Sequence, residues 1–451
     1  MQKTSGARRA PFIELALAPF VRFSHVEASG GIVLIACTLV ALVWANSPYA
    51  PAYAALWDTP VTVGFGGLVL SKTLLHWIND GLMAVFFFTV GLEIKREILV
   101  GELNTLGQAV LPVAAAVGGM AVPAAVYAAV NHGLPSLSGW GVPMATDIAF
   151  ALGILSLLGD RVPAGLKVFL AAVAIVDDIG AVLVIAVFYS GDISLFSLFL
   201  GAGMLLCMLA ANAMGVRHPV VYLLLGAVLW LAFLKSGVHA TIAGVVAAMA
   251  IPARTRLPAG AFAVRVRRLL DSFERADSDG GPLLANKAQI AVLEEIETAC
   301  RKAGAPLSRI EHALHPFVAF AVMPVFALAN AGVALSGEAG GLVGEPVAVG
   351  IVLGLVAGKF VGIFGVCLAM FRLGWASLPD GAQLRHYAGV ACLAGIGFTM
   401  SIFIAGLAFG EQGHLVATAK LAVLAASTAA GLIGYAVLRL VGSGETPGRV
   451  S

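Results

Sequence analysis

Charged residues are scarce in this sequence. Only 12% of its 451 residues are Asp, Glu, Lys or Arg, whereas hydrophobic residues make up 60% and the mean hydropathy is +0.96. A soluble domain carries about 25% charged residues, so the composition indicates an integral membrane protein. The net charge of +2 gives no reason to expect a nucleic-acid partner.

Cysteine is also rare. The five cysteines are spread between Cys37 and Cys392 without a CxxC pair. Four of them lie in apolar segments, where cysteine commonly acts as a small packing residue. The sequence therefore predicts neither a disulfide framework nor a resident metal site, and no cofactor is expected.

Apolar runs of about 20 residues, the length that crosses a bilayer as a helix, are abundant instead. They predict an all-α polytopic membrane protein with about 12 transmembrane helices, at 25–46, 73–99, 107–131, 141–158, 168–189, 195–214, 219–234, 238–252, 312–335, 347–371, 386–409 and 415–438. The chain then divides into an N-terminal segment 1–24, helices 1 to 8 over 25–252, a loop 253–310, helices 9 to 12 over 311–438, and a tail 439–451. The first run is long enough to remain as a helix, and we do not expect a cleaved signal peptide.

The basic residues test this count. Cytoplasmic loops of membrane proteins carry an excess of Lys and Arg. With twelve helices, 23 of the 27 basic residues fall on the side of the N-terminus, and Lys72, Lys235 and Lys420 fall near the other face. A wrong number of spans would distribute the Lys and Arg residues over both sides of the membrane. The twelve-span count concentrates them on one side, so both termini are predicted to be cytoplasmic.

Two stretches do not have the pattern of a membrane helix. Residues 61–71 (VTVGFGGLVLS) alternate around Gly66 and Gly67, which predicts a small extracytoplasmic β-hairpin. Residues 253–310 are polar and of mixed charge, and they predict a cytoplasmic loop with one or two short amphipathic helices. A solvated connector is the simplest interpretation of this loop.

Asp177 and Asp178 lie near the middle of an apolar run bounded by Lys167 and Asp192. One charged side chain at the bilayer centre costs about 2.5–3.5 kcal/mol on insertion scales, so two together would cost about 5–7 kcal/mol. A free-energy cost of this size indicates that the two carboxylates have a functional role.

Two further ionisable residues are expected at a similar depth. Lys359 is thirteen residues from both Pro346 and Arg372, and Asp147 is twelve residues before Gly159. A structural salt bridge between Lys359 and one aspartate would need only one acid, whereas three are present. Adjacent helical residues point about 100° apart, so Asp177 can face a partner helix while Asp178 faces a cavity. One functional site is the better interpretation.

Two helices near this site have the composition of interrupted helices. One carries Pro143 shortly before Thr146 and Asp147, and the other contains several glycines between 395 and 406. Both share a faint T-x3-F-x2-G pattern, beginning at Thr146 and at Thr399. Paired interrupted segments in two halves of a chain are typical of a transporter binding site.

These motifs resemble those of the NhaA-type sodium/proton antiporters of bacterial inner membranes, over nearly the whole chain. The matching stretches are WINDGLMAVFFFTVGLEIKRE (77–97), ATDIAFALG (145–153), AIVDDIG (174–180), LKSGVHATIAGV (234–245), IEHALHPFVAF and FALANAG (310–332), GK (358–359) and GIGFTMSIFIAGLAFG (395–410). The resemblance implies inverted repeats, with two interrupted helices that cross at the membrane midplane.

The resemblance also implies residue roles. Asp177 and Asp178 resemble the pair that binds the ion and the proton, and Lys359 resembles the cation that pairs with Asp177 when sodium is absent. Thr146 and Asp147 match residues at the crossing of the broken helices, where Asp147 and Lys359 offset helix-end dipoles.

The resemblance also includes residues outside the group formed by Asp177, Asp178, Asp147 and Lys359. Asp80 matches an acid of the second helix, and a polar packing role is its simpler interpretation. The residues that match a cytoplasmic pH-sensing cluster are Glu93, Arg96, Glu97, Glu311, His312 and His315. The alternative interpretation is that these residues form a solvated rim at the membrane interface and do not sense pH. His239 matches a histidine with pH effects, although a cap or packing role would also suit it. The 253–310 loop is longer than we expect for the family.

The sequence thus predicts an electrogenic secondary transporter that exports Na+ and Li+ in exchange for protons, and not an enzyme. The resemblance further implies pH-dependent activity and a homodimer in the bacterial inner membrane. Two other functions are compatible with an apolar, polytopic chain. A sodium-coupled solute symporter would need a roomier site with groups for the solute. An intramembrane aspartyl protease would need GxGD, but Leu157 and Tyr189 stand where the first glycine of that motif is required.

Overall fold

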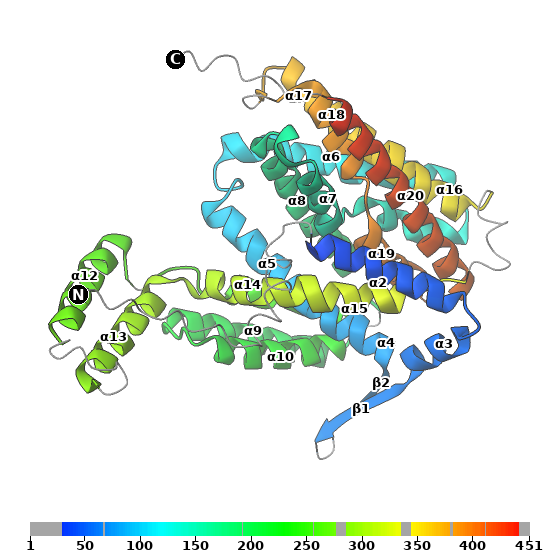
Figure 1. The fold of residues 1–451 in the computed structure, drawn as a ribbon. Coiled ribbons are helices and arrows are strands. Elements are labelled where there is room, and N and C mark those ends of the chain that lie inside the picture. The colour runs from blue at the N-terminus through cyan, green and yellow to red at the C-terminus, as the bar shows by residue number, and fades with distance from the viewer. Residues whose placement is uncertain are drawn as a thin grey trace, which may run out of the picture.

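The computed structural model describes residues 29–65, 68–191, 193–255, 257–276, 286–334, 344–378, 382–410 and 412–441, which are mostly helical (Figure 1). The predicted segment 1–24 and most of the tail 439–451 lie outside these residues. The helices are α2 (Ser29–Ala45), α3 (Ala50–Asp58), α4 (Leu74–His76), η1 (Trp77–Leu82), α5 (Met83–Val100), α6 (Leu106–Val130), η2 (Pro135–Met144), α7 (Ile148–Leu157), η3 (Gly159–Arg161), α8 (Ala164–Phe188), α9 (Leu195–Ala213), α10 (Pro219–Leu234), α11 (Ala240–Ala250), α12 (Ala259–Arg275), α13 (Lys287–Ala303), α14 (Pro306–Phe317), η5 (Val318–Val322), α15 (Met323–Asn330), α16 (Pro346–Val352), η6 (Leu353–Gly358), α17 (Lys359–Arg372), α18 (Leu384–Leu393), α19 (Phe398–Phe409) and α20 (Gly413–Leu440).

The described residues contain several helices that could cross a membrane. Six are long and apolar enough by length and composition, and there are up to nine if each of three bent helix pairs counts as one span. A polytopic membrane protein is therefore confirmed. Each of the twelve predicted segments holds a helix, but α10 and α11 are short. Twelve spans stay a prediction.

Two of the bent pairs are the segments predicted to be interrupted. η2 and α7 are bent by 40° across residues 145–147, and α18 and α19 are bent by 45° across residues 394–397. The first segment begins earlier than predicted, at Pro135 instead of 141. Proline at a first helical position has a suitable φ and no unsatisfied N–H, which explains the earlier start.

The third bent pair was not predicted. α2 turns by 114° into α3, which packs near α4. The hydroxyl of Tyr53 on α3 donates to Leu328 O at 2.8 Å, which ties this helix to α15. The short apolar run that forms α3 gave no clear helical signal in the sequence.

Strands occupy the region where the sequence predicts a hairpin. β1 (Pro60–Phe65) pairs antiparallel with β2 (Leu68–Thr73), with Pro60 opposite Thr73. The predicted turn at Gly66 and Gly67 lies outside the described residues. The pair extends from the helical body near α3 and α4 (Figure 1).

The 253–310 region forms two amphipathic helices, as predicted. α12 and α13 pack on each other and extend beyond one end of α9, α10 and α14 (Figure 1). Two backbone hydrogen bonds, both of 3.1 Å, join the segments that lead into and out of this helix pair. Leu257 N donates to Lys302 O, and Leu307 N donates to Pro252 O. α14 begins at Pro306, so the predicted start of this span at 312 was late, again because proline suits a first helical turn.

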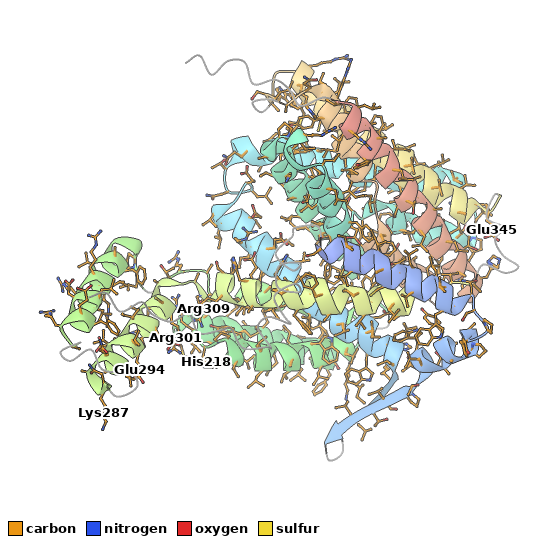
Figure 2. All side chains as sticks on the ribbon, in the orientation of Figure 1. His218, Lys287, Glu294, Arg301, Arg309 and Glu345 are labelled. Carbon is orange, nitrogen blue, oxygen red and sulfur yellow. The ribbon has the colours of Figure 1, made fainter. Side chains whose placement is uncertain are left out.

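Several charged side chains lie at one end of the molecule (Figure 2). Lys287, Glu294, Arg301 and Arg309 lie at the end formed by α13 and α14, whereas Glu345 lies at the far end (Figure 2). The long helices between these ends are largely apolar.

Small residues let the central helices approach closely. A Cβ atom on Gly118 of α6 would lie 2.5 Å from Gly362 O on α17, and one on Gly362 would lie 2.2 Å from Gly118 O. Contacts of this kind are typical of helix pairs in membranes. The neighbouring Gly119 faces Ile363, and the Lys359 side chain lies slightly farther from it.

Candidate ion-binding site

α8 carries Asp177 and Asp178 into the interior of the helical bundle. Their exposed fractions are 0% and 1%. The helix is otherwise apolar, with buried residues such as Val173 and Ala181 on either side of the pair. Burying two carboxylates is costly unless each is protonated, paired or ligated, so their neighbours decide what they can do.

Lys359 supplies the opposite charge. It is the first residue of α17, directly after the π-helical stretch η6, and it is fully buried. Its Nζ donates to Asp177 Oδ2 and forms an ion pair with it. The predicted pairing of Lys359 with Asp177 is thus present in this structure.

Thr146 also contacts Asp177. Its hydroxyl oxygen lies 2.8 Å from Asp177 Oδ2 and 2.8 Å from Ala394 O. Thr146 lies in the break between η2 and α7, and Ala394 begins the break between α18 and α19. One side chain therefore joins the carboxylate to both interrupted segments.

The Asp147 side chain binds the N-termini of α7 and α19, the helices that follow the two breaks. Its Oδ1 accepts from Phe150 N at 3.2 Å and so caps α7. Its Oδ2 accepts from the N–H of Thr399 at 3.1 Å and from the Thr399 hydroxyl, at the start of α19. A carboxylate at two helix N-termini satisfies unpaired N–H groups and offsets both dipoles.

Two carboxylate oxygens of the site have no hydrogen-bond partner among the described residues: Asp177 Oδ1 and Asp178 Oδ1. Buried polar atoms normally have partners, so these oxygens are available to a proton or a cation. Hard cations prefer oxygen ligands. Among the described residues no group of three or more His, Cys, Asp or Glu side chains could hold a metal ion. The two unpartnered oxygens are of the kind that binds hard cations.

The predicted cytoplasmic cluster is partly assembled around Arg96. Its Nη2 lies 3.1 Å from Glu97 Oε1 and 4.0 Å from Glu93 Oε1, and its Nε lies 2.9 Å from Glu311 Oε1 on α14. The Nε hydrogen does not point along the last contact, so this contact is an ion pair without a well-formed hydrogen bond. The cluster links α5 to α14.

The two histidines of that prediction are not joined to Arg96. His312 and His315 are exposed on α14, and His312 Nδ1 lies 2.7 Å from Ser308 O in its own helix. His239 precedes α11, with its ring 5.7 Å from the Phe403 ring. Asp80 is half-buried in η1, and its carbonyl accepts from the Trp230 indole. None of these residues contacts Asp177 or Asp178 in the described bonds.

Sequence reasoning gave no role to three hydroxyl groups that bind residues in or beside the two interrupted segments. Thr399 binds Asp147, the Ser401 hydroxyl donates to Val142 O at 2.7 Å, and Ser427 Oγ accepts from Phe398 N at 3.0 Å. The repeated T-x3-F-x2-G pattern contained a signal for Thr399. Ser401 and Ser427 gave no signal, because hydroxyl residues are common in membrane helices.

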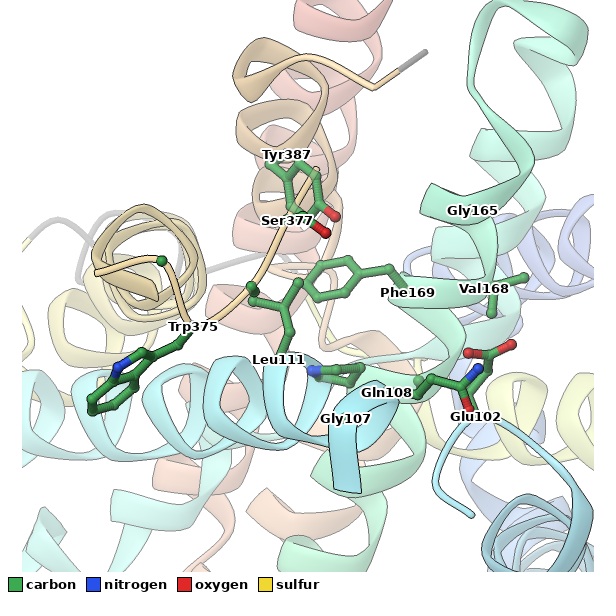
Figure 3. A pocket seen from close by; sticks show the side chains of 14 residues that line it. Glu102, Gly107, Gln108, Leu111, Gly165, Val168, Phe169, Trp375, Ser377 and Tyr387 are labelled. Carbon is green, nitrogen blue, oxygen red and sulfur yellow. The ribbon is translucent and has the colours of Figure 1, made fainter. Parts of the chain in front are cut away.

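A pocket of about 470 Å³ lies away from these carboxylates (Figure 3). Phe169 and Leu111 lie between Glu102 on one side and Trp375 on the other, with Tyr387 and Ser377 above them. The charged residues of the candidate site do not line it.

Comparisons with known proteins identify the family of the chain. The model of the family "Na+/H+ antiporter 1" matches residues 21–438. Three similar relatives carry the name Na(+)/H(+) antiporter NhaA, in one case NhaA 2. The protein of Oleidesulfovibrio alaskensis is 56% identical over 98% of each chain. That of Sorangium cellulosum is 51% identical over 94% of this chain and 90% of the relative. That of Koribacter versatilis is 47% identical over 98% and 96%. The chain belongs to the Na+/H+ antiporter 1 family.

Proposed function

We propose that the chain is an electrogenic secondary antiporter that exports Na+ or Li+ and takes in protons. The proton-motive force across the bacterial inner membrane would drive the exchange. The observation that carries this proposal is the pair of buried carboxylates with one unpartnered oxygen each, beside a buried lysine. The names of the relatives, at 47–56% identity, support it.

Competition for Asp177 and Asp178 couples the two ions. Without sodium, Asp177 is paired with Lys359 and Asp178 holds a proton, which limits the cost of burying charge. When Na+ enters from the cytoplasm, Asp178 binds it together with Asp177, and protons leave. Because the two acids are adjacent, they titrate as a unit. No separate coupling device is needed, since one site cannot hold both cargoes.

The two interrupted segments provide the route. They belong to inverted repeats, and they cross at the membrane midplane, where Asp147 binds the N-termini of α7 and α19. Irregular backbone at that depth must line a cavity or be enclosed by protein. Movement of the crossing against the other helices would open the carboxylates to either side.

The orientation follows from the charge distribution. In this proposal twelve spans leave both termini and α12–α13 in the cytoplasm, and β1–β2 on the outside. The exposed edges of β1–β2 suit pairing with a second copy, so the transporter is a homodimer. The Arg96 cluster, on the cytoplasmic side, adjusts activity to pH. His239, His312 and His315 contribute to the same pH response, and Asp80 is an acidic residue of the second helix.

Asp178→Asn tests the proposal. An amide has nearly the size of a carboxylate, but it cannot carry the proton or the negative charge. In proteoliposomes with an imposed pH gradient, we expect Na+ addition to collapse the gradient with the unaltered protein and not with Asp178→Asn. The exposed α12 variant Asp271→Asn serves as the matched control and should exchange normally. Full exchange by folded Asp178→Asn would refute the assignment.

A further inference from the structure

The repeated T-x3-F-x2-G pattern places one phenylalanine in each interrupted segment. Phe150 of α7 lies four residues after Thr146, and Phe403 of α19 lies four residues after Thr399. In the proposed topology α7 runs from the membrane midplane toward the cytoplasm, and α19 runs from the midplane toward the outside. The two phenylalanines are therefore equivalent residues on opposite sides of the carboxylates.

The Phe403 ring is enclosed by other rings. Its centroid lies 5.8 Å from that of Phe87, 6.2 Å from that of Phe326 and 5.7 Å from that of His239. These rings belong to α5, to α15 and to the residue before α11, so all three come from outside the interrupted segments. Aromatic rings at such distances attract each other beyond the effect of buried area. With an exposed fraction of 3%, Phe403 ties α19 to the surrounding helices.

Phe150 has different surroundings. It is only partly buried, and among the described residues its one ring contact is with Phe398, 4.8 Å away in α19. That contact joins the two interrupted segments to each other, and it does not join α7 to the helices around it. Two residues that are equivalent in the sequence pattern are thus enclosed by rings on one side of the carboxylates and not on the other.

The enclosed ring lies close to the depth of the candidate ion-binding site. Val90 of α5 and Ile175 of α8 belong to one small hydrophobic cluster, and in the proposed topology these two helices run in opposite directions. Asp178 follows Ile175 by three residues on α8. Phe87 precedes Val90 by three residues on α5, so Asp178 and Phe87 lie at a similar depth. Because α19 runs outward from the midplane, Phe403 packs against Phe87 on the outer side of the carboxylates.

We propose that Phe403 and Phe150 are alternating gates of the ion pathway. Phe403 closes the path from the carboxylates to the outside, and Phe150 closes the path from the carboxylates to the cytoplasm. In the present arrangement the outer gate is closed and the inner gate is not. When α19 moves to release Na+ outside, Phe403 leaves its three aromatic neighbours, and Phe150 becomes enclosed by the helices on the cytoplasmic side. The pathway is then never open to both sides at once, which exchange requires.

The two gates have opposite effects on the balance between the inward-open and outward-open states. The ring contacts of Phe403 exist only in the inward-open state, so weakening them raises the population of the outward-open state. Weakening the enclosure of Phe150 lowers that population. The apparent affinity for Na+ on each side follows the population of the state that binds Na+ from that side.

This inference rests on the proposed function, so Na+/H+ exchange by the unaltered chain is measured first. The KM for Na+ is then measured separately on each side, in inside-out and right-side-out membrane vesicles, at one fixed pH on both sides. In Phe403→Leu the KM on the extracytoplasmic side should fall about tenfold, and the KM on the cytoplasmic side should rise. In Phe150→Leu both values should change in the opposite directions.

Phe409→Leu is the matched control. Phe409 lies on the same helix as Phe403 and has the same exposed fraction of 3%, but its ring lies against Gly139 of η2. This variant should lower the free energy of unfolding without moving either KM. If Phe403→Leu does not fold, Phe87→Leu alters the other side of the same ring contact and should give the same two shifts.

The outcomes separate the gates from a purely structural role. A structural role would lower stability or the maximal rate in every variant, without opposite changes of KM on the two sides. Unmoved KM values in folded Phe403→Leu or Phe87→Leu, shifts of Phe403→Leu and Phe150→Leu in the same direction, or equal shifts in Phe409→Leu would overturn the gates. Absence of exchange in the unaltered chain would instead refute the proposed function.

Discussion

Lys359 and Asp177 form an ion pair in which both side chains have an exposed fraction of 0%. A buried pair is strongly destabilised when one partner is removed, because the other is left as an uncompensated charge. Replacing both partners can be nearly neutral. The contribution of this ion pair to folding stability can therefore differ from its contribution to transport.

A double-mutant cycle can separate the contribution to stability from the contribution to transport. We expect Asp177→Asn or Lys359→Met alone to lower the free energy of unfolding by about 3–5 kcal/mol, since each leaves one buried charge unpaired. The double variant should recover most of this loss, while it exchanges no sodium. Thermal unfolding in detergent measures stability, and proteoliposome assays measure exchange. Additive losses in the double variant would show that the two residues do not stabilise each other.

The pairing of Lys359 with Asp177 could be predicted from the sequence and its resemblance to the family. Lys359 and the aspartates stand out because apolar runs surround them, and their positions along their helices give similar depths. The break near residues 145–147 was visible from Pro143. Ionisable residues in membrane spans are costly, so each one carries information.

Other parts of the site could not be predicted. Ala394 acts through its backbone carbonyl, and the sequence contains no signal for a carbonyl. Ser401 and Ser427 depend on which helices cross, and no local pattern gives that relation. The helix α3 and the early starts at Pro135 and Pro306 were missed because propensity near a helix end is weak information.

The Arg96 cluster should set the pH profile of exchange. We expect proton loss from Glu93 to activate transport in this regulation. Burial and the negative charge of Glu311 both raise the pKa of Glu93, so Glu311→Gln should let Glu93 lose its proton at lower pH. The profile should move to lower pH by several tenths of a unit or more, with the maximal rate largely kept. The measurement is exchange rate against pH at saturating Na+.

His312→Asn provides the comparison for this variant. The histidine lies on the same helix as Glu311, but it is exposed and does not contact Arg96 in the described ion pairs. We expect a smaller shift than that of Glu311→Gln. A lower rate with an unmoved profile in Glu311→Gln would mean that the cluster only supports the fold.

The β1–β2 pair should hold the homodimer together. Its side chains at Val63 and Val69 are 57% and 61% exposed, and a two-stranded sheet has two free edges. Replacing residues 61–70 with a short glycine–serine linker should give monomers that still exchange ions. Light scattering in detergent at a matched protein concentration measures the mass. A deleted protein that stays dimeric would place the interface elsewhere.

The most direct test of the central claim is the apparent affinity for Na+ as a function of pH. If Na+ and H+ compete for Asp177 and Asp178, the KM for Na+ should rise as pH falls. The rise should approach tenfold per pH unit in the steepest region, where one competing proton dominates. The measurement is the Na+ dependence of exchange in proteoliposomes, with the same pH on both sides at each point. A steep rise at acidic pH and a plateau at alkaline pH are the predicted result, and a KM for Na+ that does not change with pH would contradict the competition.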